Sequence, residues 1–328
     1  AQFDTVDENI EITLQPQTSV VIMDQYTGQV KAIVGGRGTK QTSLSLNRAT
    51  DSTRQPGSTF KVVSTYAPGL NECGMTLATT IKDEPYKYAN GKPVRNWDGK
   101  YIGSATVRYA IEHSMNVCAV RTLTETVGLE KGYEYLQRFG FTTLVDGTDE
   151  NYPGHTDIAQ STALGGITRG VYNMELTAAF ASIANGGEYT EPVLYTQILD
   201  HDGNVLIDNT TPDTHEVIKE STAYLLTSAM EDVVRKGTGT PARLSNMTVA
   251  GKTGTTDDST DLWFVGYTPY YTGGVWGGYD ANKHMSGMNS NWHKTLWKNI
   301  MERVHEGLED KDFEIPSSVV RKSICRES

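Results

Sequence analysis

Hydrophobic and polar positions near the start of the chain follow the pattern of β-strands. Apolar and β-branched residues dominate residues 18–23 and 29–34, and Thr27-Gly28 lies between the two runs. Two such runs joined by a glycine-containing turn are typical of a β-hairpin. The pattern predicts that a sheet begins here.

From residue 56 to about residue 243 the spacing of apolar positions becomes mostly helical. Phe60, Val63, Ser64 and Ala67 share one helical stripe, which is expected to end at Pro68. The pattern therefore predicts a long helical insertion after the first two strands.

Three further segments lie within this insertion. Residues 83–103 are rich in Pro, Gly, Asn and Tyr and are expected to form a loop. Residues 193–199 and 204–207 flank Asp202-Gly203 and predict a surface hairpin. A helix is predicted over residues 220–236, where Gly237 ends it.

Strand character returns at the end of the chain. Residues 247–250, 262–267 and 273–278 predict three strands, and a helix follows with apolar residues at every fourth position: Trp292, Leu296, Ile300 and Val304. The whole order predicts an α/β fold of the α+β kind, with a mainly antiparallel sheet built from both ends of the chain. A cleft is expected between this sheet and the helical insertion.

Composition narrows the classes of function. The 328 residues carry 29 Lys and Arg against 40 Asp and Glu, a net charge of −11, so nucleic acid is not expected as a partner. No run approaches the roughly 18 apolar residues of a membrane span. Cys73, Cys118 and Cys325 form no C-x-x-C pair and are expected to be buried thiols, and the seven histidines include no H-E-x-x-H pair. A metal site is therefore not predicted.

The sharpest local feature is the turn of residues 54–61. Pro56 and Gly57 precede Ser58 at a predicted helix start, and Lys61 follows three residues later on the same face. A buried neutral lysine could take the proton of the Ser58 hydroxyl and make it a nucleophile. The alternative interpretation is a helix-capping serine beside a solvated lysine.

Ser114 and Asn116 form a second feature, next to a predicted apolar helix over residues 117–123. A serine beside such a nucleophile can relay a proton to a leaving amine, and an asparagine amide can hold a peptide bond. The alternative interpretation is again a helix cap.

The third feature is K-T-G-T-T at residues 252–256, which follows the predicted strand 247–250. Gly254 would let a substrate backbone approach the strand, while Lys252, Thr253 and Thr255 could bind a terminal carboxylate. A phosphate loop is disfavoured because position 246 is Asn where that motif needs Gly.

S-x-x-K, S-x-N and K-T-G in this order are typical of penicillin-binding proteins and class A β-lactamases. The chain resembles the transpeptidase domain of class A, bifunctional penicillin-binding proteins over roughly residues 17 to 325. The resemblance extends through the segments Asn47-Arg48-Ala49-Thr50, Asn96-Trp97-Asp98, Ala163-Leu164-Gly165-Gly166, Ala184-Asn185-Gly186-Gly187 and 263–269 (W-F-V-G-Y-T-P).

This resemblance implies a D,D-transpeptidase that cross-links peptidoglycan stem peptides and is acylated by β-lactams. It implies Ser58 as nucleophile, Lys61 as general base, and Ser114 with Lys252 as the proton path. Asn116, Thr253, Gly254 and Thr255 would bind the donor peptide. The main-chain N–H groups of Ser58 and Thr255 would form the oxyanion hole. No metal or organic cofactor is implied.

The resemblance also sets expectations about organisation. Residues 1–16 are expected to be a linker and residues 17–328 the transpeptidase domain, with sheet segments at about 17–57 and 244–328 and the helical insertion at about 58–243. A membrane anchor and a glycosyltransferase domain are expected upstream in the complete protein, which would place the enzyme on the outer side of the cytoplasmic membrane.

Three other functions remain open at the level of sequence. A D-Ala-D-Ala carboxypeptidase would use the same motifs and hand the acyl group to water. A β-lactam sensor would acylate without turnover. A β-lactamase would need a water-activating glutamate, and Glu150 is the nearest match, but E-N-Y-P-G lacks the E-x-x-L-N pattern and indicates a solvated acidic loop.

Overall fold

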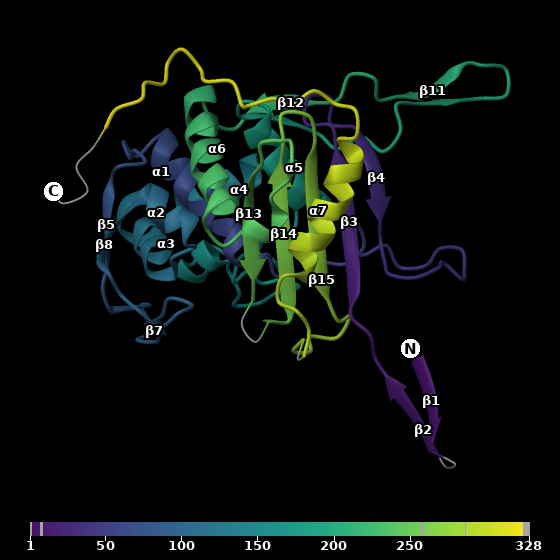
Figure 1. Cartoon of the computed structure of the whole chain (residues 1–328), viewed down its shortest axis with the longest axis horizontal. Helices are drawn as coiled ribbons and strands as arrows, with labels where there is room; N and C mark the ends of the chain where they lie inside the picture. The colour runs from purple at the N-terminus through teal and green to yellow at the C-terminus, as the bar shows by residue number, and fades with distance from the viewer. Residues whose placement is uncertain (1, 7–8, 257–258, 286, 324–328) are drawn as a thin grey trace.

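A five-stranded antiparallel sheet lies at the centre of the computed structural model, which describes residues 2–6, 9–256, 259–285 and 287–323. Its strand order is β13-β14-β15-β3-β4, so both ends of the chain contribute strands, as predicted (Figure 1). The five strands are β3 (Gln17–Met23), β4 (Val30–Val34), β13 (Ala250–Thr255), β14 (Asp261–Tyr267) and β15 (Thr272–Gly278).

Helices cover both faces of this sheet, and two glycines of β15 let them come close. A Cβ on Gly274 would lie 2.1 Å from Thr177 Oγ1 of α5 (Asn173–Ala184), and one on Gly273 would lie 2.8 Å from Trp297 Nε1 of α7 (Trp292–Val304). Successive strand residues point to opposite faces. The helices α5 and α7 therefore sandwich the sheet.

The predicted helical insertion is confirmed between β4 and β13. It holds the helical elements η1 (Gly57–Thr59, a 3₁₀ turn), η2 (Lys61–Tyr66, a π-helix), α1 (Ala67–Asn71), α2 (Val107–Glu112), α3 (Asn116–Thr122), η3 (Leu123–Val127, a π-helix), α4 (Leu129–Arg138), η4 (Gln160–Leu164, 3₁₀), α5, α6 (Glu220–Arg235) and η5 (Thr240–Ala242, 3₁₀). Short strand pairs join them: β5 (Thr80–Asp83) with β8 (Gly103–Thr106), β6 (Tyr86–Lys87) with β7 (Pro93–Val94), and β9 (Glu188–Thr190) with β12 (Thr214–Glu216).

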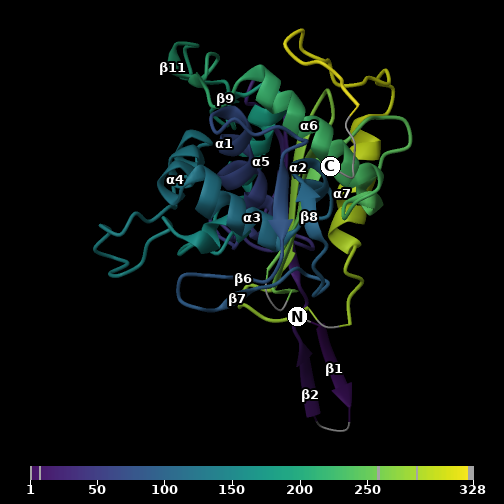
Figure 2. The same cartoon turned by 90° about the vertical axis from the view of Figure 1, so that its left-hand side faces the viewer.

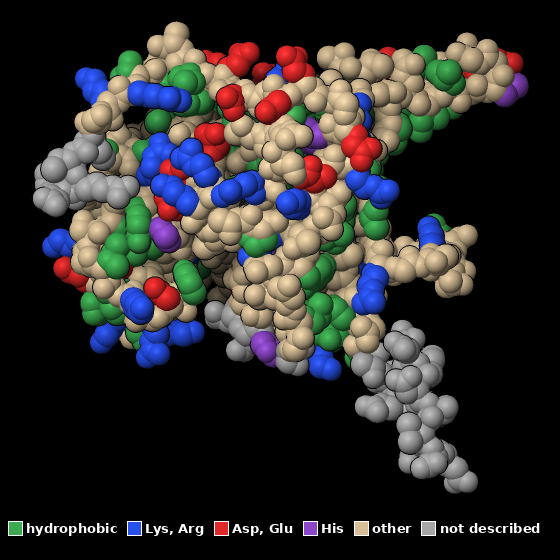
Figure 3. Space-filling model, viewed as in Figure 1, with side chains coloured by type: hydrophobic (Ala, Val, Ile, Leu, Met, Phe, Trp, Pro, Cys, Tyr) green, Lys and Arg blue, Asp and Glu red, His purple; other side chains and the backbone are tan. Residues whose placement is uncertain are grey.

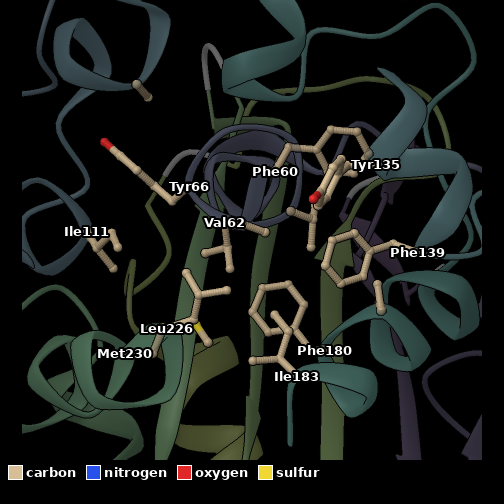
Figure 4. Close-up of a cluster of buried hydrophobic side chains, with 14 of the residues drawn as sticks. Phe60, Val62, Tyr66, Ile111, Tyr135, Phe139, Phe180, Ile183, Leu226 and Met230 are labelled. Carbon is tan, nitrogen blue, oxygen red and sulfur yellow. The ribbon is translucent and has the colours of Figure 1, made fainter. Parts of the chain in front are cut away.

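The main hydrophobic core lies between these helices and the inner face of the sheet. Figure 4 shows side chains from several elements converging on it, and all of those labelled are buried: Phe60, Val62, Tyr66, Ile111, Tyr135, Phe139, Phe180, Ile183, Leu226 and Met230. A smaller core, which includes Phe264 and Trp297, lies under α7. The segment that carries Ser58 is thus held inside the main core.

Two hairpins extend from this body. β1 (Gln2–Val6) pairs with β2 (Asn9–Thr13) near the N-terminus, and β10 (Gln197–Leu199) pairs with β11 (Val205–Asp208) at the far end of the molecule (Figure 2). The second hairpin was predicted and is confirmed. Hydrophobic side chains lie exposed along it (Figure 3).

Several predicted boundaries were wrong. The helix does not end at Pro68: the π-helix η2 continues directly into α1, which carries Pro68 and ends at Asn71. The strand predicted at 247–250 begins at Ala250 and continues through the K-T-G-T segment, because β14 pairs with every residue up to Thr255. The expected loop at 83–103 includes the short strand pair β6–β7.

The predicted last helix is confirmed, and its buried face overlaps the apolar stripe, since Leu296 and Ile300 pack against the smaller core. His293, Trp297 and Met301 are its buried residues, one position on from the apolar stripe that begins at Trp292. A hydrogen bond from Trp297 Nε1 to the carbonyl oxygen of Gly273 ties this face to the sheet at 2.9 Å. Specific packing on β15 therefore selects the face.

The cysteine prediction is confirmed at one position only. Cys118 is buried, whereas Cys73 is only half-buried, because it lies where α1 ends near the surface. Cys325 lies outside the described residues.

Candidate active site

The segment before Ser58 is pressed against the edge strand β13. Gly57 has φ of 55°, and a Cβ on it would lie 2.8 Å from the carbonyl oxygen and 3.0 Å from the nitrogen of Thr255. Only glycine permits this approach in this backbone conformation. The main chains at Ser58 and Thr255, the two residues predicted to form an oxyanion hole, are thereby brought together.

Arg54 anchors the start of this turn to the sheet. Its Nε donates to Asp261 Oδ1 at 2.7 Å, and its guanidinium lies 5.0 Å from the centre of the Trp276 ring. Trp276 Nε1 donates to the same Asp261 oxygen at 2.9 Å. Since Arg54 and Asp261 are both buried, this ion pair fixes the turn relative to β14 and β15.

Lys61 lies in the π-helix η2 and is completely buried. Its Nζ donates to the carbonyl oxygen of Ser114 and to Asn116 Oδ1, both at 2.6 Å, and lies 3.2 Å from Ser114 Oγ. The sequence predicted an approach of this amine to the Ser58 hydroxyl. In the described part of the chain, its hydrogen bonds go to the second motif instead.

Ser114 connects two lysines. Its Oγ accepts a hydrogen bond from Lys252 Nζ at 2.8 Å, on the other side from Lys61. Its backbone has φ of 54°, a left-handed conformation that is costly for a residue with a side chain. We call the side chains of Lys61, Ser114 and Lys252 the cleft floor.

The electrostatics of the cleft floor favour neutral amines. Burial, followed by the charge of Lys252, holds the pKa of Lys61 well below its usual value. Burial, followed by repulsion from Lys294, lowers the pKa of Lys252 to about 7. Among the described residues neither lysine forms an ion pair that would offset these effects, so a neutral amine is accessible near neutral pH.

Asn96 holds the second motif in place. Its Oδ1 accepts the N–H groups of Asn116 at 2.9 Å and Val117 at 3.2 Å, and its Nδ2 donates to Asp83 Oδ1 at 2.8 Å. Met115, at the N-cap of α3, makes no side-chain capping bond, so Asn96 satisfies these helix donors from a distant loop. Asn116 in turn donates from Nδ2 to the carbonyl oxygen of Arg95 at 2.8 Å.

Successive side chains of the K-T-G-T segment point to opposite faces of β13. Lys252 points inward to Ser114, while Thr253 Oγ1 lies 2.9 Å from Thr238 Oγ1. A Cβ on Gly254 would lie 2.5 Å from the carbonyl oxygen of Pro56. The absence of a side chain at Gly254 therefore leaves room for the protein's own turn at Pro56. The contact of Gly254 with a substrate backbone remains a prediction.

A cleft of about 1050 Å³ opens beside these groups. Ser58, Asn116 and Thr255 contribute to its lining, with the segments 88–90, 92–95 and 159–161 around them. The remaining predicted residues lie beneath it: Lys61, Ser114, Lys252, Thr253 and Gly254 are buried. Within the described residues no three His, Cys, Asp or Glu side chains cluster in a way that could hold a metal ion.

Comparison with known proteins places this arrangement in a family. The family described as penicillin binding protein transpeptidase domain matches residues 18–302. Penicillin-binding protein 1A of Clostridium botulinum is 36% identical over 324 residues, covering 95% of this chain and 38% of that protein. Penicillin-binding protein 1A/1B of Bacillus subtilis is 32% identical over 337 residues, covering 97% and 35%.

Solved structures agree with the fold. PonA1 from Mycobacterium tuberculosis in complex with penicillin V has a TM-score of 0.80 and 25% identity, covering 93% of this chain and 82% of that one. Penicillin-binding protein 1A from Haemophilus influenzae has a TM-score of 0.79 and 25% identity, covering 94% and 51%.

These matches identify the fold as that of the penicillin-binding transpeptidases. The chain belongs to the penicillin-binding protein transpeptidase family, and within it to the class A group. It spans little more than a third of the length of the curated relatives that it matches. In the described part of the chain no helix is both long enough and apolar enough to cross a bilayer.

Sequence reasoning assigned no role to three residues that support the site. Asn96 was noted only as part of the resemblance, while Thr238 and Lys294 were not noted at all. Asn96 bonds to the second motif from a loop, and Thr238 bonds to Thr253 from the turn after α6. Lys294 reaches the third motif only through Thr238, to which it donates from α7. Local sequence patterns do not indicate these residues, because each is well separated in sequence from the residue that it contacts in the fold.

Proposed function

We propose that this protein is a D,D-transpeptidase that cross-links peptidoglycan stem peptides through a serine acyl-enzyme. The observation that carries the proposal is the connected cleft floor. Lys61, Ser114 and Lys252 form one buried hydrogen-bonded chain, directly beneath a cleft that Ser58 lines.

In the first step, Ser58 Oγ attacks the carbonyl carbon of the penultimate D-Ala of the donor. Neutral Lys61 accepts the hydroxyl proton, for which its lowered pKa suits it. The main-chain N–H groups of Ser58 and Thr255 stabilise the negative oxygen that forms. Removing one donor of such a pair typically costs about 3–4 kcal/mol of transition-state stabilisation.

The bond to the terminal D-Ala then breaks, and its nitrogen takes a proton from Ser114 Oγ. Lys252 donates a proton to Ser114 in turn, since its Nζ lies 2.8 Å away and its pKa of about 7 makes it a ready donor. The product is an ester between Ser58 and the shortened donor peptide, with D-Ala released.

In the second step, the amine of another stem peptide attacks this ester. The same groups run in reverse, so the amine loses its proton to the cleft floor and Ser58 regains one. Asn116, Thr253 and Gly254 bind the donor peptide in this proposal, and Thr255 binds its carboxylate with Thr253. A β-lactam carries a similar carboxylate and amide, so it acylates Ser58 as well.

We also propose the organisation that this activity needs. Residues 17–328 form the transpeptidase unit and residues 1–16 lead into it. Its partners are stem peptides, both donor and acceptor, and β-lactams. Since peptidoglycan lies outside the cytoplasmic membrane, the unit acts on that side.

The decisive experiment uses a donor peptide ending in D-Ala-D-Ala and a separate amine acceptor. We expect a cross-linked product with many turnovers per protein, and none with Ser58→Ala, whose melting temperature should stay unchanged. Release of D-Ala without cross-linked product would identify a carboxypeptidase instead. A single turnover would identify a sensor.

A further inference from the structure

The donor carboxylate needs a positive partner, and Lys252 is poorly suited to that part. Its amine is buried, with hydrogen bonds to Ser114 Oγ at 2.8 Å and to the carbonyl oxygen of Thr253 at 3.1 Å. With a pKa of about 7 it is neutral for part of the time at neutral pH. In the proposed function it also passes a proton, so its charge changes during the reaction.

The side chain of Thr253 faces a different neighbourhood from that of Lys252. Its Oγ1 lies 2.9 Å from Thr238 Oγ1, and Lys294 Nζ of α7 donates to the main-chain carbonyl oxygen of Thr238 at 3.2 Å. A continuous path of contacts thus runs from the Lys294 amine to the hydroxyl that is proposed to bind the carboxylate.

Lys294 is the basic group at the far end of this path. It lies on α7, and its charge lowers the pKa of Lys252. Burial lowers the pKa of Lys294 itself as well. Its helix neighbour His293 has both ring nitrogens unpartnered in the buried interior, and its pKa is lowered to about 3, so it adds no charge. Glu112, whose carbonyl oxygen accepts the N–H of Thr238, has its carboxylate paired with Lys236 at 3.1 Å.

We propose that Lys294 is a specificity-determining residue, whose positive charge, acting beside Thr238 and Thr253, favours donors and inhibitors that end in a free carboxylate. This inference rests on the proposed function. Lys294 acts through Thr238 and Thr253 and does not react itself.

The test compares acylation of Ser58 by benzylpenicillin and by its methyl ester, which lacks the negative charge. Lys294→Gln keeps a donor for the Thr238 carbonyl but removes the charge. We expect its second-order rate with benzylpenicillin to fall because one nearby charge is lost. Lys294→Gln also relieves the repulsion that lowers the pKa of Lys252, which affects both compounds alike. The ratio of the benzylpenicillin rate to the ester rate should therefore fall by about tenfold, and this carboxylate-dependent loss should lie in the binding constant rather than in the acylation step.

Two controls separate charge from structure. Lys294→Arg restores the charge and should keep the carboxylate preference. Lys298→Gln makes the same change one turn farther along α7 and should also keep it. If Lys294→Gln does not fold, Lys294→Met removes the same charge and is measured in its place.

The possible failures are distinguishable. A Lys294→Gln protein that keeps the wild-type preference, or that loses both rates equally, would overturn the role of Lys294 and leave the proposed function standing. A wild-type protein that neither compound acylates would overturn the proposed function, and this inference with it.

Discussion

The cleft floor and the β10–β11 hairpin both depart from the usual distribution of polar and apolar side chains, in opposite directions. Lys61 and Lys252 are 0% exposed, whereas Leu206 and Val205 of the hairpin are 64% and 52% exposed. Lysine is almost never fully buried without a compensating partner. In the cleft floor hydrogen bonds to Ser114 and Asn116 provide the compensation.

The cleft floor is a polar cluster that can carry chemistry, whereas the hairpin is an apolar patch that is merely exposed. Burial of the two lysines in the cleft floor disfavours their charged forms, and this lowers their pKa values into a range that suits proton transfer. All three side chains of the cleft floor are nevertheless hydrogen-bonded. The hairpin holds only its own two strands together, and its apolar residues contribute little to the stability of a single chain. Substitutions in the cleft floor should therefore slow acylation, whereas substitutions in the hairpin should change little.

Replacing Lys61 with Met would break the cleft floor most severely. The proton acceptor is lost, so acylation of Ser58 by benzylpenicillin should slow by about 10²–10⁴-fold. The melting temperature should fall only modestly, because the burial cost of the amine is removed along with its hydrogen bonds to Ser114 and Asn116. Stopped-flow acylation and thermal unfolding test this.

Lys131→Met is the matched control, since Lys131 is a surface residue paired with Glu72. It should acylate at the wild-type rate. A Lys61→Met protein that also acylates within about threefold of wild type would show that the general base lies elsewhere.

Replacing Asn96 with Ala tests whether the support of the cleft floor matters as well as its members. Two N–H groups of α3 lose their acceptor, which should cost about 1–3 kcal/mol of stability and slow acylation by about tenfold. Asn204→Ala is the comparison from the hairpin, where the side-chain amide donates to Asp200 Oδ2 in an exposed turn. If the two variants behaved alike, Asn96 would have no positioning role.

The lowered pKa of Lys252 predicts how stability changes with pH. The folded state releases the proton at about pH 7, whereas an unfolded lysine keeps it up to roughly pH 10.4. The unfolded state therefore binds more protons between these values. The free energy of unfolding of wild type, relative to Lys252→Met, should rise by up to about 1.4 kcal/mol per pH unit above pH 7.

Urea unfolding at pH 7, 8 and 9 measures this difference. The comparison with Lys252→Met removes the contributions that other groups make to both proteins. A difference that stays flat with pH would mean that Lys252 titrates normally in the folded protein.

The smallest effect is expected in the hairpin. Leu206→Ser should change the free energy of unfolding by less than about 0.5 kcal/mol, because the side chain is already exposed. Phe180→Ala in the main core should cost about 3–5 kcal/mol by the same measurement. A large loss in Leu206→Ser would show that the hairpin contributes to the fold after all.

Much of the fold could be predicted because its elements have strong local patterns. The hairpin β3–β4 and the helix α6 lie close to their predicted positions, since each pattern is bounded by a turn or a glycine. The three motifs were also recognisable together, and the structure brings them to one cleft.

The errors have a common physical cause. Lys252 and Thr253 look like loop residues, yet they lie in a buried strand because Ser114 and Thr238 satisfy their polar groups. The centre of the buried face of α7 is set by contacts such as Trp297 with Gly273, which helical spacing cannot show. Tertiary partners that lie far away in sequence decided each of these cases.

The most direct test of the account is to locate the penicilloyl group after treatment with benzylpenicillin. Intact-mass spectrometry and peptide mapping should find one adduct, on the peptide that contains Ser58. It should persist for many minutes and keep its lifetime in Glu150→Gln, since Glu150 is exposed and does not line the cleft. An adduct on another residue would contradict the assignment of Ser58, and rapid loss of the adduct that Glu150→Gln prevents would identify a β-lactam hydrolase instead.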